Sequence, residues 1–172
     1  MLHRAQEFLV RQKTMLINAL RGHFGEFGLV VVQVASRVSE VIAVIEDPED
    51  NRLPGLTRGA LGSLVTQLKA VQAQIGSLEK RLMVWNRASN ASRRLETIPW
   101  VGVITATALV ATIGDASQLH SGRQLAAAWL GLVPRQYSSG GKERLDRVSK
   151  HGDGYLRKLL VHGARSVTAQ ER

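Results

Sequence analysis

The sequence predicts an all-α protein with a long coiled-coil or helical-hairpin arm, followed by a small helical domain with a helix-hairpin-helix-like element. Two observations support this prediction. Apolar residues recur with helical spacing through the first part of the chain. After about residue 95, short apolar helices alternate with glycine-bearing turns. We therefore expect an arm over residues 1–95 and a separate C-terminal domain over residues 96–172.

The arm is predicted to begin with two helical segments. One apolar stripe covers residues 2–24, and the glycine-bearing sequence HFGEFG breaks it. A second stripe covers residues 31–45; its valines also suit a strand, but their 3-4 spacing favours a helix. An acidic linker with two prolines follows at about residues 46–57. Thr57 is the expected N-cap of the next helix.

The clearest pattern in the chain is an unbroken 3-4 spacing of apolar residues over more than three heptads. Such a seam is typical of a coiled coil. It can close against the earlier helices of the same chain or against another subunit, so a helical hairpin and an oligomer are both open. The seam consists of Leu61, Leu64, Leu68, Val71, Ile75, Leu78, Leu82 and Trp85.

The C-terminal domain is predicted to start with two helices joined by a tight turn in LETIPWVGVITATAL. The first helix ends near Ile98 and the second starts at Val103. Such a turn exposes backbone N–H groups that bind phosphate, and Gly102 lies within it. Trp100 stands where DNA-binding hairpins usually have glycine, and an ordinary helix–helix connection is the alternative.

Two further helices are expected beyond this turn. Ser121 and Gln124 form a capping box at the start of one, and Pro134 is expected to end it. The last helix covers the sequence GYLRKLLVHGARSV. Its apolar side is formed by Leu156, Leu159, Leu160 and Val167.

The charge of the chain favours a polyanionic partner. The 172 residues include 23 Lys and Arg against 14 Asp and Glu, a net charge of +9 that is spread along the chain. The absence of cysteine excludes disulfides and thiolate catalysis. No apolar run approaches the ~20 residues of a membrane helix, and no signal peptide is recognisable at the start. We expect a cytoplasmic, nucleoid-associated bacterial protein without membrane contact.

The loop RQYSSGGKERLDR and its flanks combine serines, glycines and cations. Attack of a serine on a phosphodiester needs charge stabilisation in the transition state, which five cations in sixteen residues could supply. The chemistry alone nevertheless favours a flexible connector. The cations are Arg135, Lys142, Arg144, Arg147 and Lys150, offset by Glu143 and Asp146.

No metal site is expected in the chain. The five histidines are scattered without ligand spacing. The acidic residues between positions 46 and 50 lie in the proline-broken linker, where a solvated hinge is the better interpretation. No set of strand-borne carboxylates suited to two-metal phosphoryl chemistry is visible.

Three stretches of the chain, read together, resemble a bacterial insertion-sequence transposase. They are IPWVGVITATALVATIGDASQL, the segment from SGRQLAAAWLGLVPRQYSSGGKERLDRVSK to HGDGYLRKLLVHGARSV, and the first 28 residues. The family is the one that pairs an N-terminal DEDD (resolvase-like) domain with a serine-bearing C-terminal transposase domain. The resemblance covers the whole chain and is densest between residues 98 and 167. It implies DNA transposition by strand cleavage and transfer, with a helical coiled-coil arm for assembly and a guide RNA encoded by the element.

The resemblance also implies roles for particular residues. Ser139, immediately before Gly140, matches the family's nucleophilic serine, and Ser138 is the second choice. The glycine-and-cation loop that ends in Ser-Lys-x-Gly is expected to shape the site and contact phosphate; its members include Ser149 and Gly152. The nucleic-acid-binding residues are then expected to be Arg135, Gly140, Gly141, Lys142, Arg144, Arg147, Lys150 and Gly102.

The chain begins where the family's coiled-coil arm begins, so the resemblance predicts a truncated member without the DEDD domain. No cofactor is expected in the chain itself, because a divalent metal would belong to that domain. The expected partners are DNA, a guide RNA, and either a second copy or full-length transposase. The alternative is a catalytically inactive module for nucleic-acid binding and oligomerisation, an element remnant or a competitor of full-length transposase.

Overall fold

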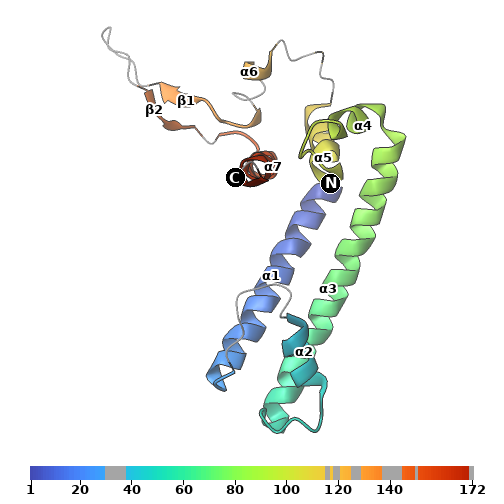
Figure 1. Ribbon diagram of the computed structural model, residues 1–172, viewed down its shortest axis with the longest axis vertical. Coiled ribbons are helices and arrows are strands. Elements are labelled where there is room, and N and C mark those ends of the chain that lie inside the picture. Colours follow the sequence, from blue (N-terminus) through green and yellow to red (C-terminus); the bar gives the residue numbers. More distant parts are fainter. Residues whose placement is uncertain are drawn as a thin grey trace. The chain divides into compact units, whose positions relative to one another are not determined.

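The computed structural model describes residues 1–29, 38–114, 117, 121–124, 129–136, 145–149 and 151–170. Most of them are helical, which confirms the predicted fold class (Figure 1). Contacts divide the chain into two compact units, Met1–Lys80 and Arg81–Arg172. The division falls inside α3 (Gly55–Ala88), so the end of this helix belongs to the second unit. A functional boundary near residue 95 stays a prediction.

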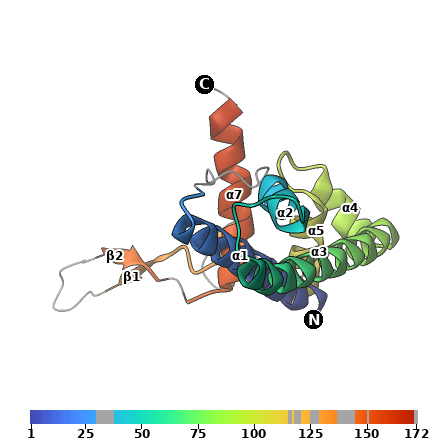
Figure 2. The same ribbon diagram turned by 90° about the horizontal axis from the view of Figure 1, so that it is seen from below.

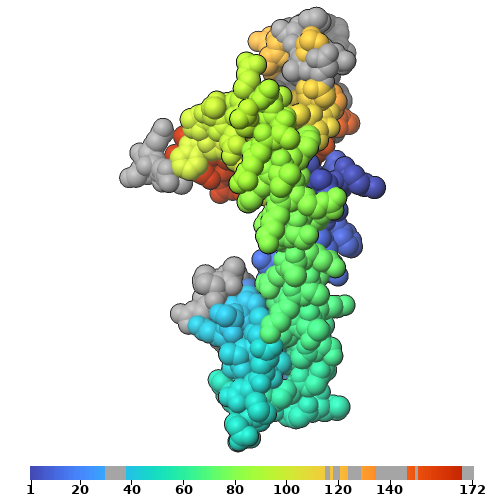
Figure 3. All heavy atoms as spheres, turned by 90° about the vertical axis from the view of Figure 1, so that its right-hand side faces the viewer, coloured from blue at the N-terminus to red at the C-terminus, as the bar shows by residue number. Residues whose placement is uncertain are grey.

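The first unit contains α1 (Leu2–Glu26), α2 (Val38–Glu46) and most of α3. The helices α1 and α3 run in opposite directions (Figure 1), and Gln6 Nε2 on α1 donates to Glu79 Oε1 on α3 at 3.4 Å. In the space-filling view of Figure 3, α2 lies along the N-terminal part of α3. The buried core of this unit consists of Leu16, Leu20, Phe24, Val38, Val41, Ile45, Leu53, Leu61, Val65, Leu68, Val71 and Ile75.

The predicted seam of α3 is buried within the chain over most of the first unit. Its members Leu61, Leu68, Val71 and Ile75 share one core cluster with residues of α1 and α2. Of the two arrangements that the seam allowed, the described residues therefore form the helical hairpin. Val65, which lies outside the predicted seam, is buried in the same cluster. It extends the stripe to the wider apolar face that a helix needs when two neighbours cover it.

Arg58 fastens the linker between α2 and α3. Among the described residues, its guanidinium donates to backbone carbonyls, including those in the last turn of α2, which a helix end leaves without intrahelical partners. The Arg58 guanidinium thus supplies hydrogen-bond donors to the end of α2 and holds the linker against the start of α3. The acceptors are the carbonyl oxygens of Val44 at 3.1 Å, Ile45 at 3.4 Å, Asp47 and Asp50.

The start of α3 differs from the prediction, because Thr57 lies inside the helix instead of capping it. The helix begins at Gly55, and the Pro54 carbonyl accepts from the Arg58 N–H at 2.9 Å. Pro54 thus occupies the N-cap position, where its carbonyl accepts the first intrahelical bond and its side chain offers no cap. The first helix also runs longer than its apolar stripe, and Gly28 makes the turn after it at a φ of +72°.

The second unit contains the end of α3 and a set of short elements. These are α4 (Asn90–Glu96), α5 (Val103–Ile113), α6 (Gly122–Gln124), β1 (Pro134–Gln136), β2 (Leu145–Val148) and α7 (Gly154–Gln170). The predicted apolar side of the last helix is confirmed at its first three positions, which pack in the core of this unit. The buried members are Ala108, Leu109, Leu130, Tyr155 and Leu156, with Leu95, Ile113, Leu159 and Leu160 partly buried against them.

A buried polar network fixes the corner between α3 and α4. Ser92 Oγ donates to Asn86 Oδ1 at 2.5 Å, and Asn86 Nδ2 donates to Glu96 Oε2 at 2.8 Å. Ser89 caps α4 by accepting from the Ser92 N–H. Buried polar groups need hydrogen-bond partners, and these bonds supply them to Asn86, which is buried. Trp85, the last predicted seam residue, is instead 36% exposed.

The two short strands were not predicted from the sequence. They lie side by side (Figures 1 and 2) and pair antiparallel. Pro134 is opposite Val148 and Gln136 is opposite Leu145. Pro134 therefore begins a strand and does not end a helix. The physical reason is that Gly131 already leaves helical geometry, at a φ of +58°. Two residues later, the Val133 carbonyl accepts from the N–H of Ser149, the residue directly after β2, at 3.0 Å.

Candidate functional site

The candidate serine loop connects the two strands of the hairpin. Of the predicted site residues, the structure describes the backbone of Arg135 in β1, the exposed Arg147 in β2, and Gly102 at the N-cap of α5. The structure thus shows the base of the loop, and assignments to its tip stay predictions. The predicted residues outside the described part of the chain are Ser138, Ser139, Gly140, Gly141, Lys142, Arg144 and Lys150.

The segment before the hairpin is fastened to the start of α7 by two hydrogen bonds. The Asp153 N–H donates to the Trp129 carbonyl at 2.6 Å. The guanidinium Nη1 of Arg157 donates to the Leu130 carbonyl at 2.8 Å. Together these bonds tie β1, which follows directly in the chain, to a helix of the core.

Ser149 and Gly152 hold the same segment from the other side. Ser149 Oγ donates to the Gly131 carbonyl at 3.1 Å. A Cβ on Gly152 would lie 2.3 Å from the Trp129 oxygen and 2.6 Å from the Gly131 nitrogen, so no side chain fits there. These contacts hold the backbone before β1, and the loop-shaping role expected for the Ser-Lys-x-Gly sequence stays a prediction.

Sequence reasoning missed Asp153 and Arg157, although both position the base of the loop. Asp153 Oδ1 accepts from the Tyr155 and Leu156 N–H groups at 2.8 and 3.2 Å, which is N-cap geometry. The sequence held a signal for this role, because an aspartate directly precedes the last predicted helix. The bond from Arg157 to a carbonyl 27 residues earlier has no local signal.

The turn between α4 and α5 has the predicted start of its second helix at Val103. Gly102 offers no side-chain cap to α5, so the first N–H groups of this helix depend on other acceptors, such as water or a phosphate. Trp100 has a φ of +68°, in the left-handed region that glycine adopts freely. This geometry explains why glycine suits the position, and it costs tryptophan about 1 kcal/mol or more.

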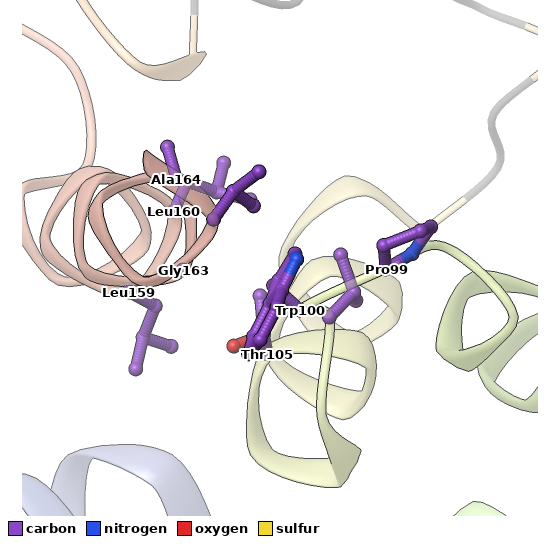
Figure 4. Close-up of a pocket in the computed structure, with 9 residues that line it drawn as sticks. Pro99, Trp100, Thr105, Leu159, Leu160, Gly163 and Ala164 are labelled. Atoms are coloured by element: carbon purple, nitrogen blue, oxygen red, sulfur yellow. The ribbon is translucent and has the colours of Figure 1, made fainter. Parts of the chain in front are cut away.

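A pocket of about 190 Å³ lies between this turn and α7. Gly163 on α7 permits the approach, because a Cβ there would lie 3.0 Å from the Trp100 carbonyl oxygen. Figure 4 shows Trp100 and Thr105 on the side of the turn and α5, with Leu160 and Ala164 across from them on α7. The lining is mainly apolar and consists of Pro99, Trp100, Val101, Thr105, Leu159, Leu160, Gly163, Ala164 and Val167.

The part of the chain that the structure describes offers no metal site: no three of its His, Asp or Glu side chains are grouped to hold an ion. Within the same ranges, no helix is both long enough and apolar enough to cross a membrane.

The comparison with known families bears on the second unit. Residues 92–172 match the family model described as Transposase IS116/IS110/IS902 family. The C-terminal part of the chain thus matches this family's transposase domain. The match includes the α4–α5 turn, the hairpin and α7.

Similarity to individual transposases extends through the arm as well. A Pseudomonas aeruginosa protein named "Probable family 20 transposase" is 41% identical over 96% of this chain and 49% of its own length. The transposase for insertion sequence element IS1111A of Coxiella burnetii is 41% identical over 92% of the chain and 43% of its own length. The transposase for IS1328 of Yersinia enterocolitica is 36% identical over 95% and 48%. The chain spans about half the length of these relatives.

Proposed function

We propose that this chain is the C-terminal portion of an IS116/IS110/IS902-family transposase that binds DNA and supplies a serine nucleophile for strand cleavage and transfer. The observation that carries the proposal is the similarity to transposases over more than nine-tenths of the chain. The net charge of +9 supports DNA as the substrate and an RNA as a further partner, because both are polyanions.

In this proposal Ser139 Oγ attacks a DNA phosphorus and displaces a sugar oxygen, which leaves as a hydroxyl after taking up a proton. The phosphoserine ester that forms keeps the phosphate reactive, so a second sugar hydroxyl can displace the serine and complete strand transfer. Charge that develops on the phosphate oxygens would be stabilised by the neighbouring cations, of which Arg147 lies at the described base of the hairpin. The contacts of Ser149, Gly152 and Arg157 hold that base.

The family resemblance assigns metal-bound carboxylates to a DEDD domain, and we propose that this domain must act beside the serine loop. We also propose that the arm assembles subunits, as a homo-oligomer or as a mixed oligomer with longer transposase chains. Met1 at the N-cap of α1 and Phe8 and Met15 on this helix support this, because they are exposed and follow one another at intervals of seven residues. A heptad repeat of exposed apolar side chains is a surface that a partner helix can cover.

The test for the nucleophile combines the chain, a DEDD domain supplied in trans and a DNA substrate that traps covalent intermediates. A protein–DNA adduct should form with the wild type and with the matched control Ser138→Ala, but not with Ser139→Ala. Equal adduct from Ser139→Ala and the wild type would refute the assignment of Ser139.

Measuring DNA binding together with adduct formation distinguishes the catalytically inactive module from the active transposase portion. Affinity for duplex DNA should fall with salt, with a log–log slope of roughly −0.9 for each phosphate neutralised. Salt-dependent binding without any adduct in the reconstituted mixture would favour a catalytically inactive nucleic-acid-binding module. A flat response to salt would contradict DNA binding in both forms of the proposal.

A further inference from the structure

We propose that the turn between α4 and α5 is a stacking site for an unpaired nucleobase, with the Trp100 indole as its platform. This inference rests on the proposed nucleic-acid function and adds a specific contact to it. Trp100 is 42% exposed and Ile98 is 49% exposed, and neither belongs to the described core of the second unit. The tip of the turn therefore presents large apolar side chains to solvent beside a helix start.

The pocket beside Trp100 has a size and lining that suit one flat ring. Its volume of about 190 Å³ lies below the roughly 300 Å³ at which pockets for drug-sized ligands begin. The lining side chains of α7 are apolar, and the indole lies at the opposite side, on the turn (Figure 4). A base that leaves its stack can lie against an indole in this way, and because every base has a π-face, such stacking tolerates any sequence.

The backbone holds the platform in place. Trp100 keeps a left-handed φ that a tryptophan adopts only at a cost, and the Val101 N–H closes the turn by donating to the Ile98 carbonyl at 3.1 Å. On the other side, Gly163 brings α7 against the Trp100 carbonyl. A rigid aromatic side chain loses little conformational entropy when a ligand binds, so this arrangement is pre-organised for stacking.

The charges around the pocket favour a nucleic acid over an apolar protein segment. Residues 97–113 and 154–170, which frame it, contain no Asp or Glu. Arg94 is exposed in the last turn of α4, and Glu96 in the same turn already accepts a hydrogen bond from Asn86. The framing segments therefore contribute no carboxylate, and the two acidic residues that directly precede them are held by hydrogen bonds, Glu96 by Asn86 and Asp153 by the first N–H groups of α7.

The test compares Trp100→Ala and Trp100→Phe with Trp85→Ala, which removes another exposed tryptophan, on α3. Binding is measured to labelled single-stranded oligothymidylate, to oligouridylate of the same length and to a DNA duplex. Trp100→Ala should weaken single-strand binding about 5- to 150-fold, or ~1–3 kcal/mol, with little change for the duplex and in the salt slope. Trp100→Phe and Trp85→Ala should bind nearly as the wild type does. If Trp100→Ala weakens binding to oligothymidylate more than binding to oligouridylate, the base comes from DNA. The reverse order identifies RNA.

A spectroscopic readout tests the contact directly. With Trp85→Phe and Trp129→Phe, Trp100 is the only tryptophan of the chain, and oligothymidylate should quench its fluorescence. Trp100→Gly guards against misfolding, because glycine adopts a φ of +68° freely and the variant should remain folded while it loses single-strand affinity.

Three outcomes would overturn the inference: unquenched fluorescence, unchanged single-strand affinity of Trp100→Ala and Trp100→Gly, or equal losses for single strands and duplex. A change in oligomeric state at unchanged nucleic-acid affinity would also overturn it, in favour of a protein partner. If the wild-type chain binds none of the three nucleic acids, the proposed function fails as well. Salt-dependent binding that is indifferent to Trp100 refutes the stacking site alone.

Discussion

Replacing Gly152 with alanine should strongly destabilise the second unit. The added Cβ would lie 2.3 Å from the Trp129 oxygen, 2.6 Å from the Gly131 nitrogen and 2.6 Å from the Leu130 carbonyl carbon. All three atoms belong to the backbone, so no flexible side chain can move aside. Either the segment before β1 or the start of α7 must shift.

The size of the effect follows from the bonds that such a shift breaks. The same two segments are joined by the bonds from Asp153 N to the Trp129 carbonyl and from Arg157 to the Leu130 carbonyl. A neutral hydrogen bond contributes about 0.5–1.5 kcal/mol and one to a charged group about 1.5–3 kcal/mol. Losing both gives ~2–4.5 kcal/mol, which overlaps the ~1–3 kcal/mol that overpacking a core costs.

Urea unfolding followed by circular dichroism measures this change, and Gly154→Ala is the matched control. A Cβ on Gly154 would lie 3.6 Å from Arg157 Nη2, which is ordinary van der Waals contact. Alanine is also a better helix former than glycine by up to about 1 kcal/mol. The midpoint for the second unit should therefore fall in Gly152→Ala and stay or rise in Gly154→Ala, at unchanged slope.

Equal unfolding midpoints for the two alanine variants would refute this reasoning. They would mean that the backbone before β1 does not pack against Gly152 in solution. The contacts that we use to fix the base of the serine loop would then be absent as well.

Two further predictions concern polar contacts. Asn86→Ala should lower the free energy of unfolding of the second unit by about 1–3 kcal/mol, because the buried Ser92 hydroxyl loses its acceptor. In urea unfolding, the exposed control Asn90→Ala should stay within about 0.5 kcal/mol of the wild type. Equal losses in the two variants would contradict the network. In the first unit, a side-chain hydrogen bond from Arg52 lowers the pKa of Asp50 from 3.8 to about 2. Since the folded pKa lies below the unfolded value, ionised Asp50 stabilises the fold above about pH 4, and this contribution is lost as the pH falls towards 2. An NMR titration should show the pKa of Asp50 rising towards 3.8 in Arg52→Gln, and an unchanged pKa would sink the assignment.

Much of the helical fold could be predicted, because helical periodicity is a property of neighbouring residues. The stripe that ends at Phe24 and the start of the second hairpin helix at Val103 both agree with the structure. One error lies where a contact with the next helix outweighs the local pattern. Trp85 fits the seam by spacing, yet Asn86 is buried because its partners Ser92 and Glu96 come from the next helix.

The candidate site was predicted from its residue types and from the family resemblance, and its nucleophile stays a prediction. Spacing could not show that Ser149 and Gly152 pack on the backbone of residues 129–131, because these groups are about 20 residues apart in the chain. The hairpin was missed for the same reason. Each of its strands is too short to carry an alternating pattern of its own, so pairing with the other strand defines it.

The sequence by itself determined the helical class, the basic charge, the serine-and-glycine loop and the apolar seam of the long helix. It left open what covers that seam, and only the tertiary structure showed α1 and α2 of the same chain there. The structure alone also showed why Trp100 is strained and why Gly152 has no room for a side chain. The physical reason is that propensity and periodicity act between neighbours along the chain. Seam partners and close backbone contacts depend on where residues far apart in sequence meet.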